Sequence, residues 1–399
     1  MALYKYPQKQ DEAVYNENQR KIQECADAYK DDVKLTVKSN KTIHSIKDFC
    51  KDFIRLAKIY RKDKEIIYVA FVPDGGLGDI LRQKTVIAAL VKMYPDIVVD
   101  IYHKSTYPFI KGIKNIRYFL NKHNLNLMKS QYDMTVEYLG PNCEISHISI
   151  INSSKPGIIK ILENLEKYKK QYPYCFDGRK YFYLQQEAVK NQQCVINVMK
   201  ITTGVSDIED LSLSIDYEKK PLKKFAIFDN DKYITIQTGV ANKGNTAHPK
   251  LWSVEKWESL LSAIKNEFGS KLKIVQVGVG VSGLKNAYVN VVDKTSIDEL
   301  CSILKKSMLH IDTDCGCVHI AKALGVKSLV LFGQTNAEYI AYPENINIVS
   351  SVCSNCYVAK GFVNIKCLLG NDKPLCMESI APEFVAQKAI EYLKDSKLI

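Results

Sequence analysis

Apolar runs of strand length alternate with helical patterns in two separate blocks of the chain. In the first block, an apolar run at 65–72 is followed by a glycine-rich turn, a helical pattern at 80–94 and a second apolar run at 97–102. Strand, helix and strand in this order form the unit of a parallel sheet. A further strand is predicted at 133–139, and helices are predicted at 155–171 and 186–203.

The same alternation returns with greater clarity in the second half of the chain. The predicted elements are strands at 232–239, 271–278, 308–312 and 327–333, and helices at 253–268, from 296 onward, and at 316–324. Ser296 and Glu299 form a capping box at the start of the second of these helices. Repeated strand-helix steps predict a second doubly wound domain.

The chain is therefore predicted to be an α/β protein of two Rossmann-like domains, each a doubly wound parallel sheet. Ahead of them, polar sequence with helical spacing at 11–29 and 43–60 predicts a helical extension. Apolar residues at spacings of three and four give the second stretch one apolar face, formed by Ile46, Phe49, Phe53, Leu56 and Ile59. The predicted division is a helical extension at 1–62, Rossmann-like domains at 63–228 and 229–380, a four-cysteine loop at 353–376 within the second domain, and a C-terminal helix at 381–399.

Charge and hydropathy narrow the class of protein. The chain has 56 Lys and Arg against 44 Asp and Glu, a formal charge of +12, which favours phosphate-bearing partners or an anionic membrane surface. The lysines are spread along the whole chain, which a generally basic proteome explains equally well, so no nucleic-acid partner is predicted. No apolar run reaches about 18 residues and the first residues are polar, which predicts a cytoplasmic protein. Peripheral contact with the inner face of the cell membrane is compatible with this charge.

The glycine-rich turn after the first strand carries a candidate catalytic residue. Gly75, Gly76 and Gly78 allow the backbone to approach a ligand, and Asp79 stands where the next helix starts. Ligands of open parallel sheets bind beyond the carboxyl ends of the strands, where this turn lies. An ionised Asp79 could act as general base for an acceptor hydroxyl, although Asp is also a preferred helix cap. The turn lacks the G-x-G-x-x-G pattern and a Walker lysine, which disfavours NAD or ATP chemistry.

The corresponding turn of the second block offers groups that suit a diphosphate. A strand closes with Thr238 and Gly239, and Lys250 and Trp252 follow on the approach to a helix. Hydroxyl, backbone N–H and ammonium groups together bind phosphate oxygens well. Lysines in loops are also commonly no more than solvated.

The segment HIDTDCGCVHIAKALG places polar groups at the end of the next strand. Asp314 could accept hydrogen bonds from sugar hydroxyls, while Gly316 opens the backbone so that the N–H groups near Cys317 and Val318 could meet phosphate. Alternatively, Asp314 only caps the helix and His319 is a core histidine with its own hydrogen-bond partner.

Four cysteines near the C-terminus have the spacing of a metal site. Cys353, Cys356, Cys367 and Cys376 lie within a loop-rich stretch, and four thiolates suit a tetrahedral structural Zn or, less commonly, Fe. A closed four-sulfur site has no open position, so it would stabilise a loop and supply no catalytic metal. Unliganded thiols or disulfides are the alternative. Cys25, like most of the other cysteines, lacks paired spacing and is interpreted as a small core or surface residue.

Taken in order, these pieces resemble the heptosyltransferases, glycosyltransferase family 9. The matching segments are 76–81, 94–95, 238–239, Lys250 with Trp252, 314–325, 331–335 and the cysteine run ending at 376–377. The resemblance implies the two-domain GT-B fold, with the acceptor on 63–228 and the donor, ADP-heptose or another nucleotide sugar, on 229–380. It assigns the base to Asp79, the acceptor loop to Gly76 and Gly78, and donor binding to Thr238, Gly239, Lys250, Asp314, Gly316, Cys317, Val318 and His319.

The predicted function is an inverting, metal-independent transfer of a sugar, heptose from ADP-heptose, to a hydroxyl of a lipopolysaccharide or other glycan. Some relatives modify protein, so an alternative is a protein O-heptosyltransferase acting on Ser or Thr of a surface protein. A catalytically inactive chain that binds a nucleotide sugar or nucleic acid is the other alternative. An oligomer is compatible with either activity.

Overall fold

The structure is a computed structural model that describes residues 3–5, 11–28, 65–103, 107–110, 112–139, 142–148, 155–205, 213–239, 248–280, 283–360 and 366–396. The chain forms two compact units, Lys34–Asp216 and Met1–Val33 together with Tyr217–Ile399. The first unit ends ahead of the limit predicted at 228/229. The reason is that the backbone N–H groups of Glu218 and Lys220 already donate to Asp298 and Ser302 of the second unit.

The unit Lys34–Asp216 is built on a five-stranded sheet in the order β4-β3-β2-β5-β6. Its strands are β2 (Ile67–Val72), β3 (Ile97–Ile101), β4 (Ile116–Phe119), β5 (Met134–Leu139) and β6 (Asn142–Ile148). The first four run parallel, and β6 pairs antiparallel with β5 at the edge. The expected parallel sheet is confirmed in β2–β5, and β6 adds one antiparallel strand at its edge, because the chain returns after Leu139 as a hairpin.

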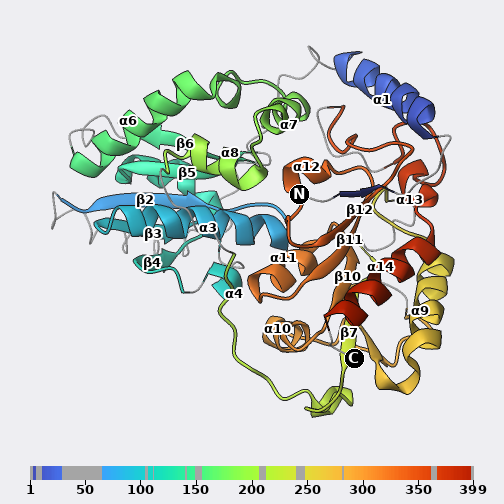
Figure 1. Cartoon of the computed structure of the whole chain (residues 1–399). Helices are drawn as coiled ribbons and strands as arrows, with labels where there is room; N and C mark the ends of the chain where they lie inside the picture. Colours follow the sequence, from blue (N-terminus) through green and yellow to red (C-terminus); the bar gives the residue numbers. More distant parts are fainter. Residues whose placement is uncertain are drawn as a thin grey trace. The chain divides into compact units, whose positions relative to one another are not determined.

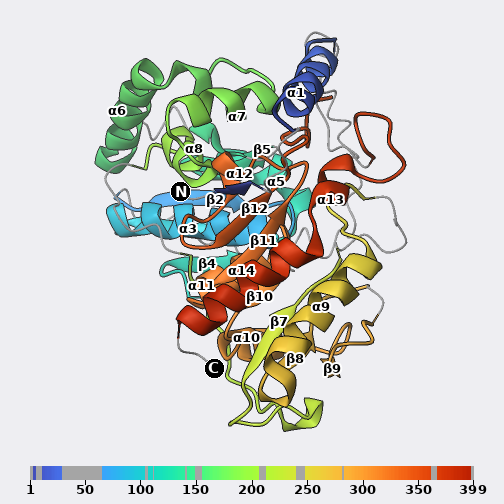
Figure 2. The same cartoon turned by 45° about the vertical axis from the view of Figure 1, so that its right-hand side comes forward.

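Helices of this unit pack on both the strands and one another. They are α3 (Leu77–Met93), α4 (Tyr107–Ile110), α5 (Leu125–Met128), α6 (Pro156–Gln171), α7 (Tyr181–Lys190) and α8 (Val195–Thr202), with single 3-10 turns η2 (Lys122–Asn124), η3 (Lys129–Gln131) and η4 (Pro173–Cys175). In both views α6, α7 and α8 gather beside β5 and β6 (Figure 1, Figure 2). The prediction of a single helix at 186–203 was wrong. The chain turns at Gln192, which has a φ of 57°, and this turn separates α7 from α8.

The second unit contains a seven-stranded, all-parallel sheet in the order β1-β12-β11-β10-β7-β8-β9. Its strands are β1 (Leu3–Lys5), β7 (Tyr233–Ile236), β8 (Lys273–Gln276), β9 (Val289–Asn290), β10 (His310–Thr313), β11 (Ser328–Phe332) and β12 (Ile346–Val349). Every residue of β7, β10, β11 and β12 is buried, as expected for parallel strands covered on both faces. The first residues of the chain thus complete the edge of this sheet.

Its helices cover both faces of that sheet. They are α1 (Asp11–Ala28), α9 (Val254–Phe268), α10 (Ile297–Lys305), α11 (Gly316–Ala323), α12 (Ala337–Ile340), α13 (Leu375–Ser379) and α14 (Pro382–Asp395), with 3-10 turns η5 (Lys223–Phe225) and η6 (Gly269–Lys271). Helices α9 and α14 lie side by side on one face, and α10 and α11 lie on the other (Figure 1). The predicted capping box is confirmed, since Ser296 Oγ accepts from Glu299 N while Glu299 Oε2 accepts from Ser296 N.

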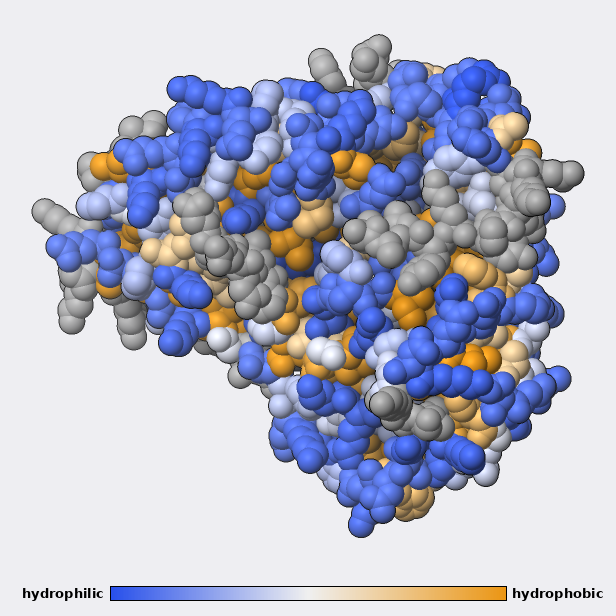
Figure 3. Space-filling view, viewed as in Figure 1, coloured by the Kyte–Doolittle hydropathy of each residue, from blue (hydrophilic) through white to orange (hydrophobic). Residues whose placement is uncertain are grey.

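Two further observations concern the chain's beginning and its surface. The helix predicted at 11–29 is α1, whereas the one predicted at 43–60 lies outside the described residues. Hydrophilic residues cover most of the face in Figure 3, and hydrophobic residues show between them in several areas. Within the part of the chain that the structure describes, no helix has both the length and the apolar character needed to cross a membrane.

Candidate functional site

The turn that joins β2 to α3 holds Asp79 in a fixed place. Gly75 has a φ of +95°, and a Cβ atom there would come within 2.8 Å of Asp79 Oδ2, so the turn requires glycine. Asp79 Oδ2 accepts from Gly76 N at 2.9 Å, which is a helix-capping contact. The Asp79 side chain is nevertheless 35% exposed. Capping and a role at the surface of the turn are therefore compatible.

Two buried residues of α3 support this turn and were not singled out in the sequence. Gln83, fully buried, accepts from Asp74 N at 3.1 Å and donates to Asp74 O at 2.7 Å, which ties the strand end to the helix. Arg82 is 3% exposed, and its guanidinium lies 3.8 Å from Asp79 Oδ1. The sequence did carry a sign of this role, because a glutamine and an arginine stand among the apolar positions of the predicted helix.

In the second unit, the structure brings Lys250 and Asp314 into direct contact. Lys250 Nζ donates to Asp314 Oδ2 at 2.8 Å and to Asp314 O at 2.9 Å, and the two side chains are only 16% and 8% exposed. Burial alone would lower the pKa of the Lys250 ammonium, but the adjacent Asp314 carboxylate outweighs burial and the pKa lies above its ordinary value. A buried ammonium that keeps its charge can exchange this carboxylate for a phosphate.

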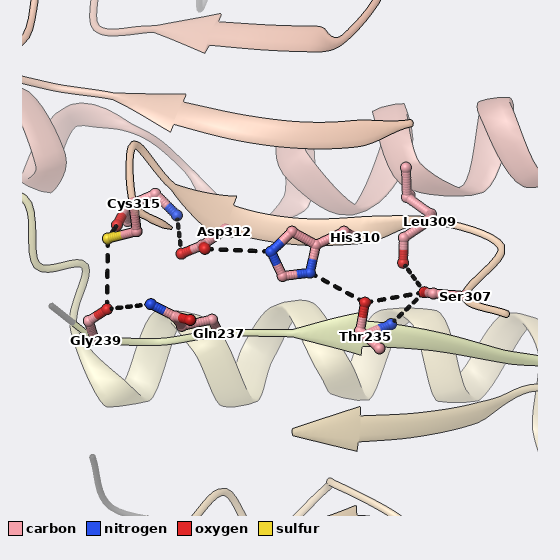
Figure 4. Close-up of polar contacts among 9 residues, drawn as sticks. Thr235, Gln237, Gly239, Ser307, Leu309, His310, Asp312 and Cys315 are labelled. Carbon is pink, nitrogen blue, oxygen red and sulfur yellow. Dashed lines mark hydrogen bonds and ion pairs between the residues drawn. The ribbon is translucent and has the colours of Figure 1, made fainter. Parts of the chain in front are cut away.

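The turn after β7 and the loop after β10 also meet. The Gly239 carbonyl accepts from Gln237 Nε2 at 2.9 Å and from Cys315 Sγ at 3.5 Å (Figure 4). Thr238 Oγ1 accepts from Gln276 Nε2 at 3.3 Å. The predicted donor residues Thr238, Gly239, Lys250 and Asp314 therefore share one end of the sheet, the carboxyl ends of β7 and β10.

Helix α11 begins at this place, with Gly316 as its first residue and Cys317 and Val318 buried behind it. Val318 N donates to Cys315 O at 3.2 Å. His319 is 6% exposed, and its Nδ1 lies 2.6 Å from the Tyr342 hydroxyl. The contact with Tyr342 agrees with the alternative that His319 is a core histidine with its own hydrogen-bond partner. Gly316 still begins helix α11, and the start of a helix favours anions.

A buried polar chain runs beneath these loops and was missed in the sequence (Figure 4). His310 Nε2 lies 3.2 Å from Asp312 Oδ2, and its Nδ1 lies 3.0 Å from Thr235 Oγ1, which lies 2.9 Å from Ser307 Oγ. Asp312 Oδ1 accepts from Thr313 N at 2.7 Å. Burial raises the pKa of the Asp312 carboxyl well above its ordinary value and lowers the pKa of His310 to about 3, so a neutral pair is favoured. Two polar residues at alternate positions of a buried strand were the signal.

The four cysteines of the C-terminal loop are neighbours in space. Cys353, Cys356 and Cys376 are buried and Cys367 is half-buried. A hydrogen bond between the Cys353 and Cys376 side chains lowers the pKa of the Cys353 thiol and raises the pKa of the Cys376 thiol. Burial, with the nearby Cys353 and Cys367, raises the pKa of Cys356 to about 12, and Cys25 of α1 contributes to that shift. Among the described residues, no group of three or more His, Cys, Asp or Glu side chains has an arrangement that could hold a metal ion.

Comparison with known proteins agrees with the resemblance seen in the sequence. The family model of glycosyltransferase family 9 (heptosyltransferase) matches residues 169–365, about half of the chain. The protein is therefore a glycosyltransferase, and the resemblance seen in the sequence is confirmed. No protein of the curated set matches the chain.

Solved structures agree with the family 9 assignment at the level of the fold. The iron-containing dodecameric glycosyltransferase TibC of enterotoxigenic E. coli H10407 is 12% identical, with a TM-score of 0.57 over 84% of this chain and 78% of that one. The E. coli ADP-heptose lps heptosyltransferase II is 11% identical, with a TM-score of 0.52 over 83% of this chain and 100% of the other. The fold is that of the GT-B glycosyltransferases.

Proposed function

We propose that this family 9 glycosyltransferase transfers heptose from ADP-heptose to a hydroxyl of a glycan, with inversion and without a catalytic metal. The observation that carries the proposal is the buried contact between Lys250 and Asp314, beside Gly239 and the start of α11. An ammonium and the N–H groups at the start of a helix stabilise the departing diphosphate, where negative charge develops. Asp314 then accepts hydrogen bonds from the sugar.

Asp79 is the proposed base in the other unit. Its carboxylate follows a parallel strand on a turn fixed by Gly75 and Gly76, and it is partly exposed. A positioned carboxylate that takes the acceptor's proton contributes roughly 10²- to 10⁴-fold to rate. In an inverting transfer the acceptor oxygen forms its bond to the anomeric carbon as the bond to the diphosphate breaks.

The relatives support the donor more than the acceptor. The lps heptosyltransferase II is named for ADP-heptose, and TibC has been solved in complex with ADP-D-β-D-heptose. A lipopolysaccharide-type glycan, met at the inner face of the cell membrane, is the proposed acceptor. Ser or Thr of a surface protein is the alternative, and an inactive chain that only binds the nucleotide sugar is the second.

The cysteine loop is proposed to hold a structural Zn or Fe through Cys353, Cys356, Cys367 and Cys376. Thiols are the soft donors that such an ion prefers, and TibC is iron-containing, although the four side chains, all among the described residues, form no metal-binding group as they stand in the structure. A bound ion would fold the loop and supply no chemistry to the transfer. Metal analysis of the purified protein should give one ion per chain, and Cys376→Ser should lose it. Wild-type protein with no bound ion would contradict this proposal.

The test of function is release of nucleoside diphosphate from ADP-heptose, ADP-glucose, UDP-sugars and GDP-sugars in the presence of glycan or peptide acceptors. We expect turnover with ADP-heptose and loss of turnover in Asp79→Ala and Asp314→Ala, with Asp74→Ala as the matched control from the same turn. Turnover with peptide instead of glycan would favour the protein O-heptosyltransferase. Binding of ADP-heptose with no turnover would favour the inactive chain.

A further inference from the structure

One side chain beside the cysteines of the C-terminal loop reaches the candidate donor site. Tyr357 follows Cys356 directly, and its ring centroid lies 5.0 Å from Lys250 Nζ. We propose that Tyr357 is a positioning residue of the donor site, which holds the Lys250 ammonium against its ring. The inference rests on the proposed function, because it gives Lys250 the donor diphosphate as its ligand.

The backbone holds Tyr357 from both directions. Its N–H donates to the carbonyl of Gln334 at 3.0 Å, directly beyond strand β11, and Gln334 is fully buried. On the other side, Ala359 N donates to Cys356 O at 3.2 Å, which closes a turn around the tyrosine. The backbone that carries the ring is therefore fixed both by the sheet that carries the donor loops and by the cysteine loop.

The chemistry of a ring suits this position better than a second carboxylate would. Lys250 directs hydrogen bonds to the carbonyl and the carboxylate of Asp314, and the aromatic face attracts the same ammonium without a formal charge. An arriving diphosphate can displace the carboxylate contact, whereas a neutral ring does not compete with it for an ionic partner. Tyr357 would thus keep the ammonium in place while its anionic partner changes.

A purely structural role makes a different prediction. If Tyr357 only packs the cysteine loop, any loss on substitution should follow the volume of the side chain and affect all ligands alike. If it positions Lys250, the loss should follow the negative charge of the ring face and be confined to ligands that carry the diphosphate.

The experiment measures dissociation constants of ADP and of adenosine for the full chain. For Tyr357→Leu we expect the Kd of ADP to rise by about 2- to 30-fold, the range that a cation–π contact supplies, and the Kd of adenosine to stay unchanged. Tyr357→Phe keeps the ring and should stay within about twofold. Tyr392→Leu is the matched control, because the Tyr392 ring lies 5.1 Å from Lys327 Nζ elsewhere in the same unit.

Fluorinated phenylalanines at position 357 provide a second series should Tyr357→Leu fail to fold, because they keep the shape of the ring while removing its negative face. We expect the Kd of ADP to rise with each added fluorine. An unchanged Kd across this series, or an equal loss for ADP and adenosine, would overturn the inference and leave the proposed function intact. Wild-type protein that binds no ADP would overturn both.

Discussion

The two candidate loops differ in how far the chain organises them before a substrate is present. In the second unit, Lys250 and Asp314 are largely buried and in contact at 2.8 Å, above a buried chain that includes His310 and Asp312. In the unit Lys34–Asp216, Asp79 is 35% exposed and its closest hydrogen bond is to the backbone of its own turn. The charges of Lys250 and Asp314 are thus closely paired and desolvated, whereas Asp79 is partly solvated and its ion pair with the buried Arg82 is longer, at 3.8 Å.

Because of this difference, substitutions in the two loops should have different effects on stability and on rate. Removing one partner of a buried ion pair leaves an uncompensated charge, so it lowers the free energy of unfolding as well as ligand binding. Changing a solvated carboxylate to its amide removes chemistry and leaves folding nearly untouched. Substitutions in the second unit should therefore affect stability and binding together, whereas those at Asp79 should affect mainly rate, with a smaller loss of stability from the longer contact with Arg82.

Asp79→Asn should have the largest effect on the reaction. We expect the transfer rate to fall by about 10²- to 10⁴-fold, because the amide cannot take the acceptor's proton. Thermal stability should fall only slightly, since Asn also caps helices and can accept from Gly76 N, and the contact with Arg82 that it weakens is 3.8 Å long. Rates with ADP-heptose and unfolding by circular dichroism check both parts. Asp74→Asn, on the same turn, is the control, and an Asp79→Asn variant that keeps full activity would remove the base from this loop.

Lys250→Met should have the largest effect on folding. The Asp314 carboxylate would lose its ionic partner at 8% exposure, and breaking such a pair costs about 3–5 kcal/mol. Urea unfolding measures this cost. Adding Asp314→Asn to Lys250→Met should recover most of the stability but not ADP binding.

A matched control for that substitution lies in the other unit. Lys122 and Asp74 form an ion pair whose side chains are 44% and 51% exposed, and such pairs contribute about 0–1 kcal/mol. Lys122→Met should therefore change unfolding by no more than this. Equal losses for Lys122→Met and Lys250→Met would contradict the contrast between the two loops.

The pH dependence of stability tests the buried chain beneath the donor loops. His310 stays neutral in the folded protein, with its pKa lowered by burial to about 3 from 6.5, whereas the unfolded chain binds a proton below 6.5. Asp312, whose pKa burial raises, keeps a proton in the folded protein that the unfolded chain has already lost, so the two groups act in opposite directions between pH 6.5 and about 4. Removing the imidazole leaves only the Asp312 contribution, so the free energy of unfolding of His310→Gln should rise relative to wild type as pH drops from 6.5 towards 4, by up to about 1.4 kcal/mol per pH unit. His123→Gln, at an exposed position, should follow wild type, and a His310→Gln curve parallel to that of wild type would contradict the role of His310.

Helices and strands with a regular repeat of apolar residues were predictable, because the apolar positions of that repeat are the positions that the fold buries. The β2-α3-β3 unit and the helices α9 and α10 follow simple apolar patterns with glycine or serine at their ends. Strand β12 was missed because it is only four residues long and has Asn347 in its middle, whose amide donates to Tyr342 O. The break between α7 and α8 was missed because Gln192, and not glycine, adopts the positive φ.

The site was predictable as a set of residues but not as contacts. Lys250 and Asp314 were each expected near the donor, yet nothing in the sequence pairs them, because the contact depends on β7 and β10 lying side by side. Tyr357 had no motif of its own and gains significance only from the position of its ring. Sequence patterns identify which strand ends carry polar groups, whereas sheet order decides which of these groups meet.

The smallest predicted effect concerns helix α1, which joins the second unit from the start of the chain. Asn18 is 8% exposed, and its Nδ2 donates to the Val352 carbonyl beside the cysteine loop at 2.9 Å. Because this hydrogen bond is buried, Asn18→Ala should lower the free energy of unfolding by about 1 kcal/mol. Gln23→Ala removes an exposed hydrogen bond to Asp27 from the same helix and should cost less than about 0.5 kcal/mol. Equal, negligible costs would mean that α1 adds little to the stability of the cysteine loop. A loss confined to Asn18→Ala would make the chain's first residues part of the support for the side chain that contacts Lys250.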